Sequence, residues 1–246
     1  QASAFLDLGK AANLPDISVQ GATVARSYSH AQPDISGPLD PSVGITFEFF
    51  TSSTADIAVA IYTPPAPSQA KRAGLVYFHG GGWVINYIGR YHAQMAAMAK
   101  KTNSVIVSVN YQKAPEHKFP IPFNDCYEGL EWTVANADRL GIDINRIGVG
   151  GDSAGGNLAA AVAVKARDEK VSLSYQLLVY PCVDRDFTTK SYVECANDFG
   201  LTTRAMEWFW DQYLQGDHHN NNPYAAPMRA ESLAGVAPSI VITAQY

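Results

Sequence analysis

The segment Gly151-Asp152-Ser153-Ala154-Gly155 has residue types and a spacing suited to nucleophilic attack on a carbonyl carbon. This G-x-S-x-G motif lies between a strand-like run, 146–150, and a helix-like run, 157–167. A serine on a sharp turn from strand to helix projects its hydroxyl group, and small neighbouring residues let the backbone bend without a steric clash. We therefore predict that Ser153 is a catalytic nucleophile.

A second motif, His79-Gly80-Gly81-Gly82-Trp83, follows the buried, strand-like run 75–78. Successive glycines allow backbone N–H groups to approach a substrate oxygen closely, and the residue after the nucleophile supplies a further N–H group. The predicted oxyanion hole therefore consists of the N–H groups of Gly81, Gly82 and Ala154. Either motif alone is a weak signal, but two such motifs, each at a strand end, indicate an esterase-like fold.

The elements that must position these motifs alternate between strands and helices. Strands are expected at 45–49, 57–62, 75–78, 105–109, 146–150, 175–180 and 239–243, and helices at 91–101, 123–139, 157–167 and 204–214. Such alternation implies a parallel sheet with right-handed crossovers, although the first two strands are expected to form an antiparallel hairpin. The aromatic residues of the last helix are expected to pack a cap onto the body of the protein.

Three blocks of the sequence resemble the hormone-sensitive-lipase-like carboxylesterases, a family of the α/β-hydrolase fold: 79–83, 109–120 and 151–156. The middle block is similar to the family's Y-R-L-A-P-E segment, with Gln112 and Lys113 in place of the usual Arg-Leu. This departure falls in a structural loop. The resemblance implies an α/β fold with a mostly parallel central sheet, flanking helices and a helical cap.

The same resemblance organises the chain as a single domain, 1–246. Cap elements are expected at about 1–41 and 184–228, and the core at about 42–183 and 229–246. The implied activity is that of a serine carboxylesterase acting on small to medium acyl esters, with no metal or organic cofactor.

Further site residues are expected around the two motifs. By resemblance, His79 supports the geometry of the glycine loop rather than transferring protons, and Asp152 braces the turn at the nucleophile without being the triad acid. Trp83 and Tyr87 are predicted to line the substrate pocket because they follow the oxyanion loop. Phe199 is added to this pocket from its place in the cap.

The other two members of a catalytic triad are not found by sequence order. In α/β-hydrolases the nucleophile is followed along the chain by Asp or Glu and then by His. The resemblance puts the acid directly beyond Tyr246 and the histidine further on. Asp184 and Asp186 follow an earlier strand, but no suitable histidine follows them.

Three explanations of the incomplete triad stay open. The acid and histidine lie in a further C-terminal segment, the chain is a natural short form without catalysis, or an unusual triad recruits His218 or His219. The first is favoured because a chain ending at Tyr246 would leave one face and one edge of a parallel sheet uncovered.

Composition and charge argue against several classes of protein. The 246 residues, 47% hydrophobic and 17% charged, are enough for one sizeable core. A net charge of −5 with scattered Lys and Arg disfavours a nucleic-acid partner, and no apolar run approaches the roughly 18 residues that span a bilayer. Cys126, Cys182 and Cys195 have no C-x-x-C spacing, so a reducing compartment such as the cytoplasm is the default.

An enzyme acting on a small-molecule ester is the preferred function, with formation of a homodimer left open. The main alternative is a catalytically inactive small-molecule receptor on the same scaffold, and a third is a protein-interaction module. The retained Ser153 and the complete glycine loop favour the enzyme.

Overall fold

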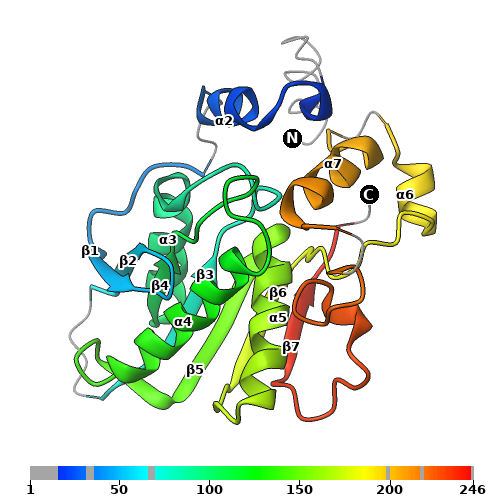
Figure 1. The fold of residues 1–246 in the computed structure, drawn as a ribbon. Coiled ribbons are helices and arrows are strands. Elements are labelled where there is room, and N and C mark those ends of the chain that lie inside the picture. Colours follow the sequence, from blue (N-terminus) through cyan, green and yellow to red (C-terminus); the bar gives the residue numbers. More distant parts are fainter. Residues whose placement is uncertain (1–15, 32–35, 66–69, 198–199, 217–218, 245–246) are drawn as a thin grey trace.

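The computed structural model describes residues 16–31, 36–65, 70–197, 200–216 and 219–244 (Figure 1). Within these residues, seven strands form one sheet in the order β1-β2-β4-β3-β5-β6-β7. The strands are β1 (Gly44–Thr51), β2 (Asp56–Thr63), β3 (Arg72–Phe78), β4 (Val105–Val109), β5 (Ile142–Asp152), β6 (Tyr175–Val179) and β7 (Ser239–Ile242).

The strand directions follow the predicted pattern. β1 pairs antiparallel with β2, and β2 pairs antiparallel with β4. The neighbouring strands β4, β3, β5, β6 and β7 all run parallel. Parallel neighbours need crossover connections, which helices supply here. The predicted leading hairpin and the predicted α/β class with a mostly parallel sheet are both confirmed.

Helices cover both faces of the sheet. α3 (His92–Thr102) packs on one face, and α4 (Ile121–Ala135) and α5 (Ala154–Asp168) pack side by side on the other (Figure 1). Side chains of β3 alternate accordingly, because successive residues of a strand point to opposite faces. Leu75 and Tyr77 join the α3 side of the core, whereas Val76 and Phe78 join the side of α4 and α5.

Several predicted boundaries are wrong, and two of them differ from the structure by four residues. β5 begins at Ile142 rather than at 146, because Ile142 already pairs with Arg72 of β3 ahead of an irregularity in the register. α4 ends at Ala135 rather than at 139, because the Asn136 N–H group closes the last turn on the Trp132 carbonyl at 3.0 Å. In both cases backbone pairing, which the apolar pattern does not reveal, decides the boundary.

Segments that precede β1 and segments from between β6 and β7 lie beyond the carboxyl ends of the central strands (Figure 1). These segments are η1 (Ile17–Val19), α2 (Ala22–Ala31), α6 (Lys190–Glu194), α7 (Thr203–Tyr213) and η4 (Pro227–Arg229). The Thr202 hydroxyl, at the start of α7, donates to Asp16 Oδ2 at 2.7 Å. This bond links α7 to the N-terminal segment, because Asp16 directly precedes η1. The sequence predicts α7 but neither α2 nor α6.

The aromatic residues of α7 pack against the glycine loop. Trp210 and Tyr213 are fully buried, with ring centroids 4.5 and 4.4 Å from that of Trp83. Phe209 is buried against Gly82. The predicted packing role of this aromatic cluster is therefore confirmed.

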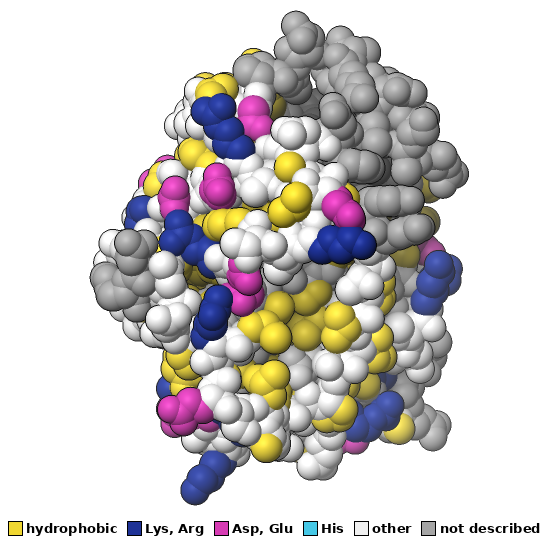
Figure 2. All heavy atoms as spheres, turned by 90° about the vertical axis from the view of Figure 1, so that its right-hand side faces the viewer, with side chains coloured by type: hydrophobic (Ala, Val, Ile, Leu, Met, Phe, Trp, Pro, Cys, Tyr) yellow, Lys and Arg dark blue, Asp and Glu magenta, His cyan; other side chains and the backbone are white. Residues whose placement is uncertain are grey.

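The edge strand β7 carries exposed apolar side chains. Ile240, Val241 and Ile242 are between 48% and 62% exposed. Figure 2 views the molecule from the side on which β7 lies, and apolar side chains gather on the surface there. A contiguous apolar surface of this kind is typical of a face that packs against further protein.

Candidate active site

Ser153 lies on a strained turn between β5 and α5. Its φ of 53° and ψ of −120° fall in a region that residues with a side chain rarely adopt. The flanking glycines are required by close backbone approach: a Cβ on Gly155 would lie 2.0 Å from the Phe78 carbonyl oxygen, and one on Gly151 would lie 2.3 Å from the Gly155 carbonyl oxygen. Glycine at positions 151 and 155 is therefore needed for the chain to pass so close to the end of β3.

The loop after β6 lies against Ser153. The Ser153 N–H group donates to the Val179 carbonyl at 2.9 Å, and Ser153 Oγ lies 3.7 Å from Cys182 Sγ. The buried Asn157 donates from Nδ2 to the Cys182 carbonyl at 2.8 Å and holds this loop to α5. Burial raises the pKa of the Cys182 thiol to about 11, so at neutral pH it is a neutral neighbour of Ser153 rather than a competing thiolate.

The glycine loop, residues 80–86, follows β3 and forms a tight turn. The Gly81 carbonyl accepts hydrogen bonds from Val84 N–H and Ile85 N–H at 3.0 and 2.9 Å. The φ angles of Gly81 and Gly82 are 120° and 56°, in the left-handed region that favours glycine. Among the described residues, no acceptor receives the N–H groups of these two glycines. The predicted role of these two N–H groups as oxyanion donors stays a prediction.

The partly buried Asp152 carboxylate joins the nucleophile turn to the glycine loop. Asp152 Oδ1 accepts hydrogen bonds from Tyr77 Oη at 2.8 Å and from Gly80 N–H at 3.0 Å. Asp152 Oδ2 accepts one from Tyr91 Oη at 2.9 Å. Burial raises the pKa of Asp152, and these hydrogen bonds oppose the rise. The residue before Ser153 thus fixes the start of the glycine loop.

A family model described as the α/β-hydrolase fold matches residues 75–246, which is more than half of the chain. This chain belongs to the α/β-hydrolase family. Its relatives include esterases and arylacetamide deacetylases, and they place this chain in the family of the hormone-sensitive-lipase-like carboxylesterases.

Two curated relatives and one solved structure illustrate the similarity. Arylacetamide deacetylase of Bos taurus is 40% identical over 170 residues, 66% of this chain and 43% of that protein. Esterase LipI of Mycobacterium tuberculosis is 34% identical over 212 residues, 85% of this chain and 66% of that protein. The structure of a hyperthermophilic esterase from Pyrobaculum calidifontis has a TM-score of 0.89 at 32% identity, covering 99% of this chain and 78% of that chain. The chain therefore spans only part of the length of these relatives.

The three predicted pocket residues of this α/β-hydrolase differ in their surroundings. Trp83 is fully buried between Trp210 and Tyr213. Tyr87 is 40% exposed, with its ring 4.9 Å from that of His30 in α2. Phe199 lies outside the described residues. Substrate contact by these three residues stays a prediction.

His79 is buried directly before the glycine loop. Its ring stacks on Tyr111 at 4.4 Å between centroids, and its Nδ1 is 2.8 Å from the Gly80 carbonyl oxygen. Burial lowers the pKa of His79 to about 3, so the ring is neutral at physiological pH. This environment suits a residue that supports the loop.

The sequence candidates for an unusual triad have other contacts. His219 packs its ring against Phe119 at 5.0 Å, and His218 lies outside the described residues. Asp184 accepts from Arg229 Nε at 2.8 Å, and Asp186 accepts from the Thr188 hydroxyl at 2.6 Å. None of these described contacts involves Ser153.

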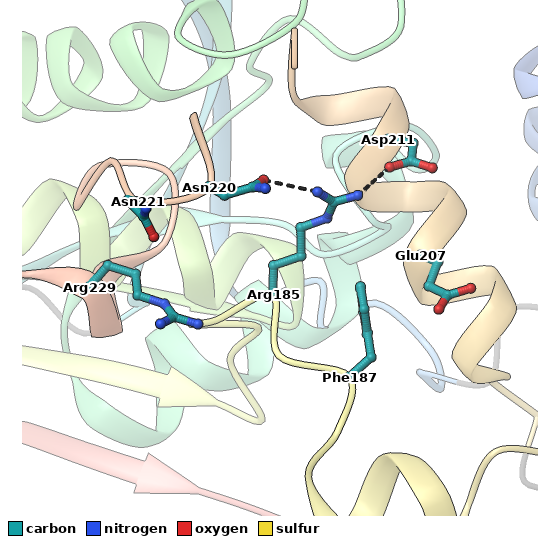
Figure 3. Close-up of a pocket in the computed structure, with 7 residues that line it drawn as sticks. All are labelled: Arg185, Phe187, Glu207, Asp211, Asn220, Asn221 and Arg229. Atoms are coloured by element: carbon teal, nitrogen blue, oxygen red, sulfur yellow. Dashed lines mark hydrogen bonds and ion pairs between the residues drawn. The ribbon is translucent and has the colours of Figure 1, made fainter. Parts of the chain in front are cut away.

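A polar cavity of about 560 Å³ lies among the loop after β6, α7 and the segment that follows α7 (Figure 3). It is lined by Arg185, Phe187, Glu207, Asp211, Asn220, Asn221 and Arg229. Arg185 bridges the cavity by donating to Asn220 Oδ1 at 2.9 Å and to Asp211 Oδ1 at 2.5 Å. This lining is mostly polar and includes neither Ser153 nor the predicted pocket residues Trp83 and Tyr87.

Within the described ranges, no group of three or more His, Cys, Asp and Glu residues could hold a metal ion. No helix among the same residues is both long and apolar enough to cross a membrane.

The side chains that contact Asp152 and Ser153 were not predicted from the sequence. Tyr77 and Tyr91 carry a usable signal, since a buried tyrosine hydroxyl needs a hydrogen-bond partner. Asn157 follows the G-x-S-x-G motif and, as a polar residue in an alanine-rich helix, carries a similar signal. Cys182 gives no such signal, because its contact with Ser153 depends on a loop that crosses from β6.

Proposed function

We propose that the full-length protein is a serine carboxylesterase that hydrolyses small to medium acyl esters. The observation that supports this most directly is the Asp152 carboxylate, which receives Gly80 N–H and so ties the glycine loop to the strained turn of Ser153. A nucleophile and a group of unpartnered N–H donors held together in this way are the two parts needed for acyl transfer.

In the proposed reaction, Ser153 Oγ bonds to the ester carbonyl carbon while its proton passes to a histidine base. The carbonyl π electrons move to the oxygen, which the N–H groups of Gly81, Gly82 and Ala154 stabilise. The C–O bond of the ester then breaks, and the leaving alcohol takes the proton from the histidine. Water hydrolyses the acyl-enzyme by the same steps.

The base and its orienting acid are proposed to lie beyond Tyr246. Two observations support this: the described contact of Ser153 Oγ is with Cys182 Sγ, and the matched relatives are longer than this chain. Ala154 is suited to its role because it begins α5, where a backbone N–H group has no acceptor within the helix. The division into core and cap and the formation of a homodimer stay predictions.

The test is steady-state hydrolysis of p-nitrophenyl butyrate by the full-length protein and its Ser153→Ala variant. Removing the nucleophile should lower kcat at least about a thousandfold. Ser174→Ala is a matched control, since it removes a hydroxyl group that donates to the Asn145 carbonyl at 2.6 Å on an exposed surface. A Ser153→Ala variant within a few-fold of the wild type would refute the assignment, and stable binding of an intact ester by the wild type would favour the receptor.

A further inference from the structure

A single arginine of α2 bonds to both loops around the oxyanion site. Arg26 Nε donates to the Val84 carbonyl at 2.8 Å, in the glycine loop. Its Nη2 donates to the Ala114 carbonyl at 2.8 Å and to Glu116 Oε2 at 2.6 Å, and its Nη1 donates to Glu116 Oε1 at 2.8 Å. The planar guanidinium group therefore satisfies four acceptor atoms of three residues in two loops, which an ammonium group could not do in the same geometry.

The two loops that Arg26 contacts are also bonded to each other. Ala114 N–H donates to the Trp83 carbonyl at 2.9 Å. Through Arg26, α2 thus contacts both the glycine loop and the segment around Ala114, and these two segments also contact each other. Movement of α2 would release the Val84 carbonyl directly.

A second contact of α2 reaches the start of the glycine loop. The Ser29 hydroxyl donates to Asn86 Oδ1 at 2.7 Å, and Asn86 Nδ2 donates to the Gly80 carbonyl at 3.3 Å. One turn of α2 therefore supports both ends of the loop.

The glycine loop needs support from outside because its backbone is strained. Trp83 and Asn86 have φ angles of 59° and 69°; such an angle is unfavourable for a bulky residue such as Trp83, whereas asparagine adopts it more readily. Such conformations persist only where surrounding contacts hold them. The Arg26 contact lies between these two positions, at Val84.

We propose that Arg26 is a positioning residue for the oxyanion site, holding the glycine loop so that the Gly81 and Gly82 N–H groups face the substrate carbonyl. This inference rests on the proposed esterase function. In this proposal, α2 holds the glycine loop and the segment 114–116 together through Arg26. Changes in this N-terminal part of the chain are therefore expected to affect kcat more than KM.

An ordinary surface ion pair of the same geometry provides the control. Arg139 donates to both oxygens of Glu48 at 2.8 Å in each case, which matches the paired bonds between Arg26 and Glu116. The Arg139 pair joins the turn that follows α4 to β1 and does not contact the glycine loop. Loss of a salt bridge alone is therefore tested by Arg139→Gln.

The experiment compares wild type, Arg26→Gln, Arg26→Lys and Arg139→Gln in the full-length protein. Hydrogen exchange is followed at the amides of Val84 and Ile85, which report whether the turn onto the Gly81 carbonyl opens, and at Val76 in the core strand β3. Initial rates with p-nitrophenyl butyrate give kcat and KM for each variant.

Arg26→Gln should speed exchange at Val84 and Ile85 about tenfold and lower kcat about tenfold, with KM within about twofold and exchange at Val76 unchanged. Arg26→Lys should fall between it and the wild type, and Arg139→Gln should match the wild type throughout. If Arg26→Gln also matches Arg139→Gln in loop exchange and kcat, the proposal is overturned. A wild type that hydrolyses no ester would refute the proposed function instead, while loop exchange would still test the role of Arg26.

Discussion

The nucleophile turn and the glycine loop are joined by Asp152, yet they are stabilised in different ways. The turn is held by backbone packing, since Gly151 and Gly155 allow α5 to press against the end of β3. The glycine loop is held largely by side chains from other elements, such as Arg26 of α2 and Phe209 of α7. The nucleophile turn is therefore specified by local sequence, whereas the glycine loop depends on remote parts of the chain.

The largest effect is expected from Gly155→Ala, which tests the backbone packing of the turn. The added Cβ would lie 2.0 Å from the Phe78 carbonyl oxygen and 2.6 Å from that of His79, and neither backbone atom can move aside. The free energy of unfolding should fall by more than about 4 kcal/mol, or no soluble protein should form. Urea unfolding measures this.

Gly44→Ala in β1 is the matched control for that change. Its added Cβ would meet the Thr63 Cβ at 3.8 Å, an ordinary contact, so its unfolding free energy should stay within about 1 kcal/mol of the wild type. Equal stability of the two variants would contradict the packing explanation of the turn.

The next largest effect is expected from Gly82→Val in the glycine loop. A Cβ at this position would lie 2.1 Å from the Phe209 ring, and φ is 56°, so the loop must shift away from the substrate. Loss of one oxyanion donor should lower kcat about a hundredfold or more. Circular dichroism should show an unchanged fold, and an unchanged kcat would mean that this donor is not used.

Asn157→Ala should have a moderate effect on stability. Asn157 Nδ2 donates to the Cys182 and Ala225 carbonyls, both at 2.8 Å, and its loss leaves these two acceptors unpaired. We expect a loss of roughly 3 kcal/mol and a melting temperature lower by about 6–12 °C. Asn145→Ala, which removes an exposed side-chain bond to Asp143 at 3.4 Å, should change little by comparison. Similar melting temperatures for the two variants would argue against the bridging role.

The smallest effect is expected from Glu116→Gln and depends on pH. Its bond to Arg26 lowers the pKa of Glu116 from 4.5 to about 2, so the pair stabilises the folded protein fully above pH 4.5 and loses that contribution as pH falls toward 2. The stability gap between wild type and variant should therefore be constant near neutral pH and shrink in acid. It should be at most about 1 kcal/mol, because Glu116 is half exposed. A gap that grows in acid would contradict this sign.

The same contrast explains what the sequence could predict. The strands and the nucleophile turn follow from local patterns, namely continuous apolar runs such as 75–78, apolar/polar alternation at 45–49 and the small residues around Ser153. The contacts of Arg26 with Val84 and Glu116 join positions 58 and 90 residues apart, and no local pattern encodes them. The position of the glycine loop was predictable, but the elements that hold it were not.

Covalent labelling of Ser153 tests the central claim most directly. The full-length protein is treated with a fluorophosphonate, digested and analysed by peptide mass spectrometry, alongside Ser153→Ala. A serine activated for acyl transfer should carry one phosphonyl group on the peptide containing Ser153, and the variant should carry none. Ester hydrolysis by a protein whose label lies on another residue, or which shows no label at all, would contradict the account.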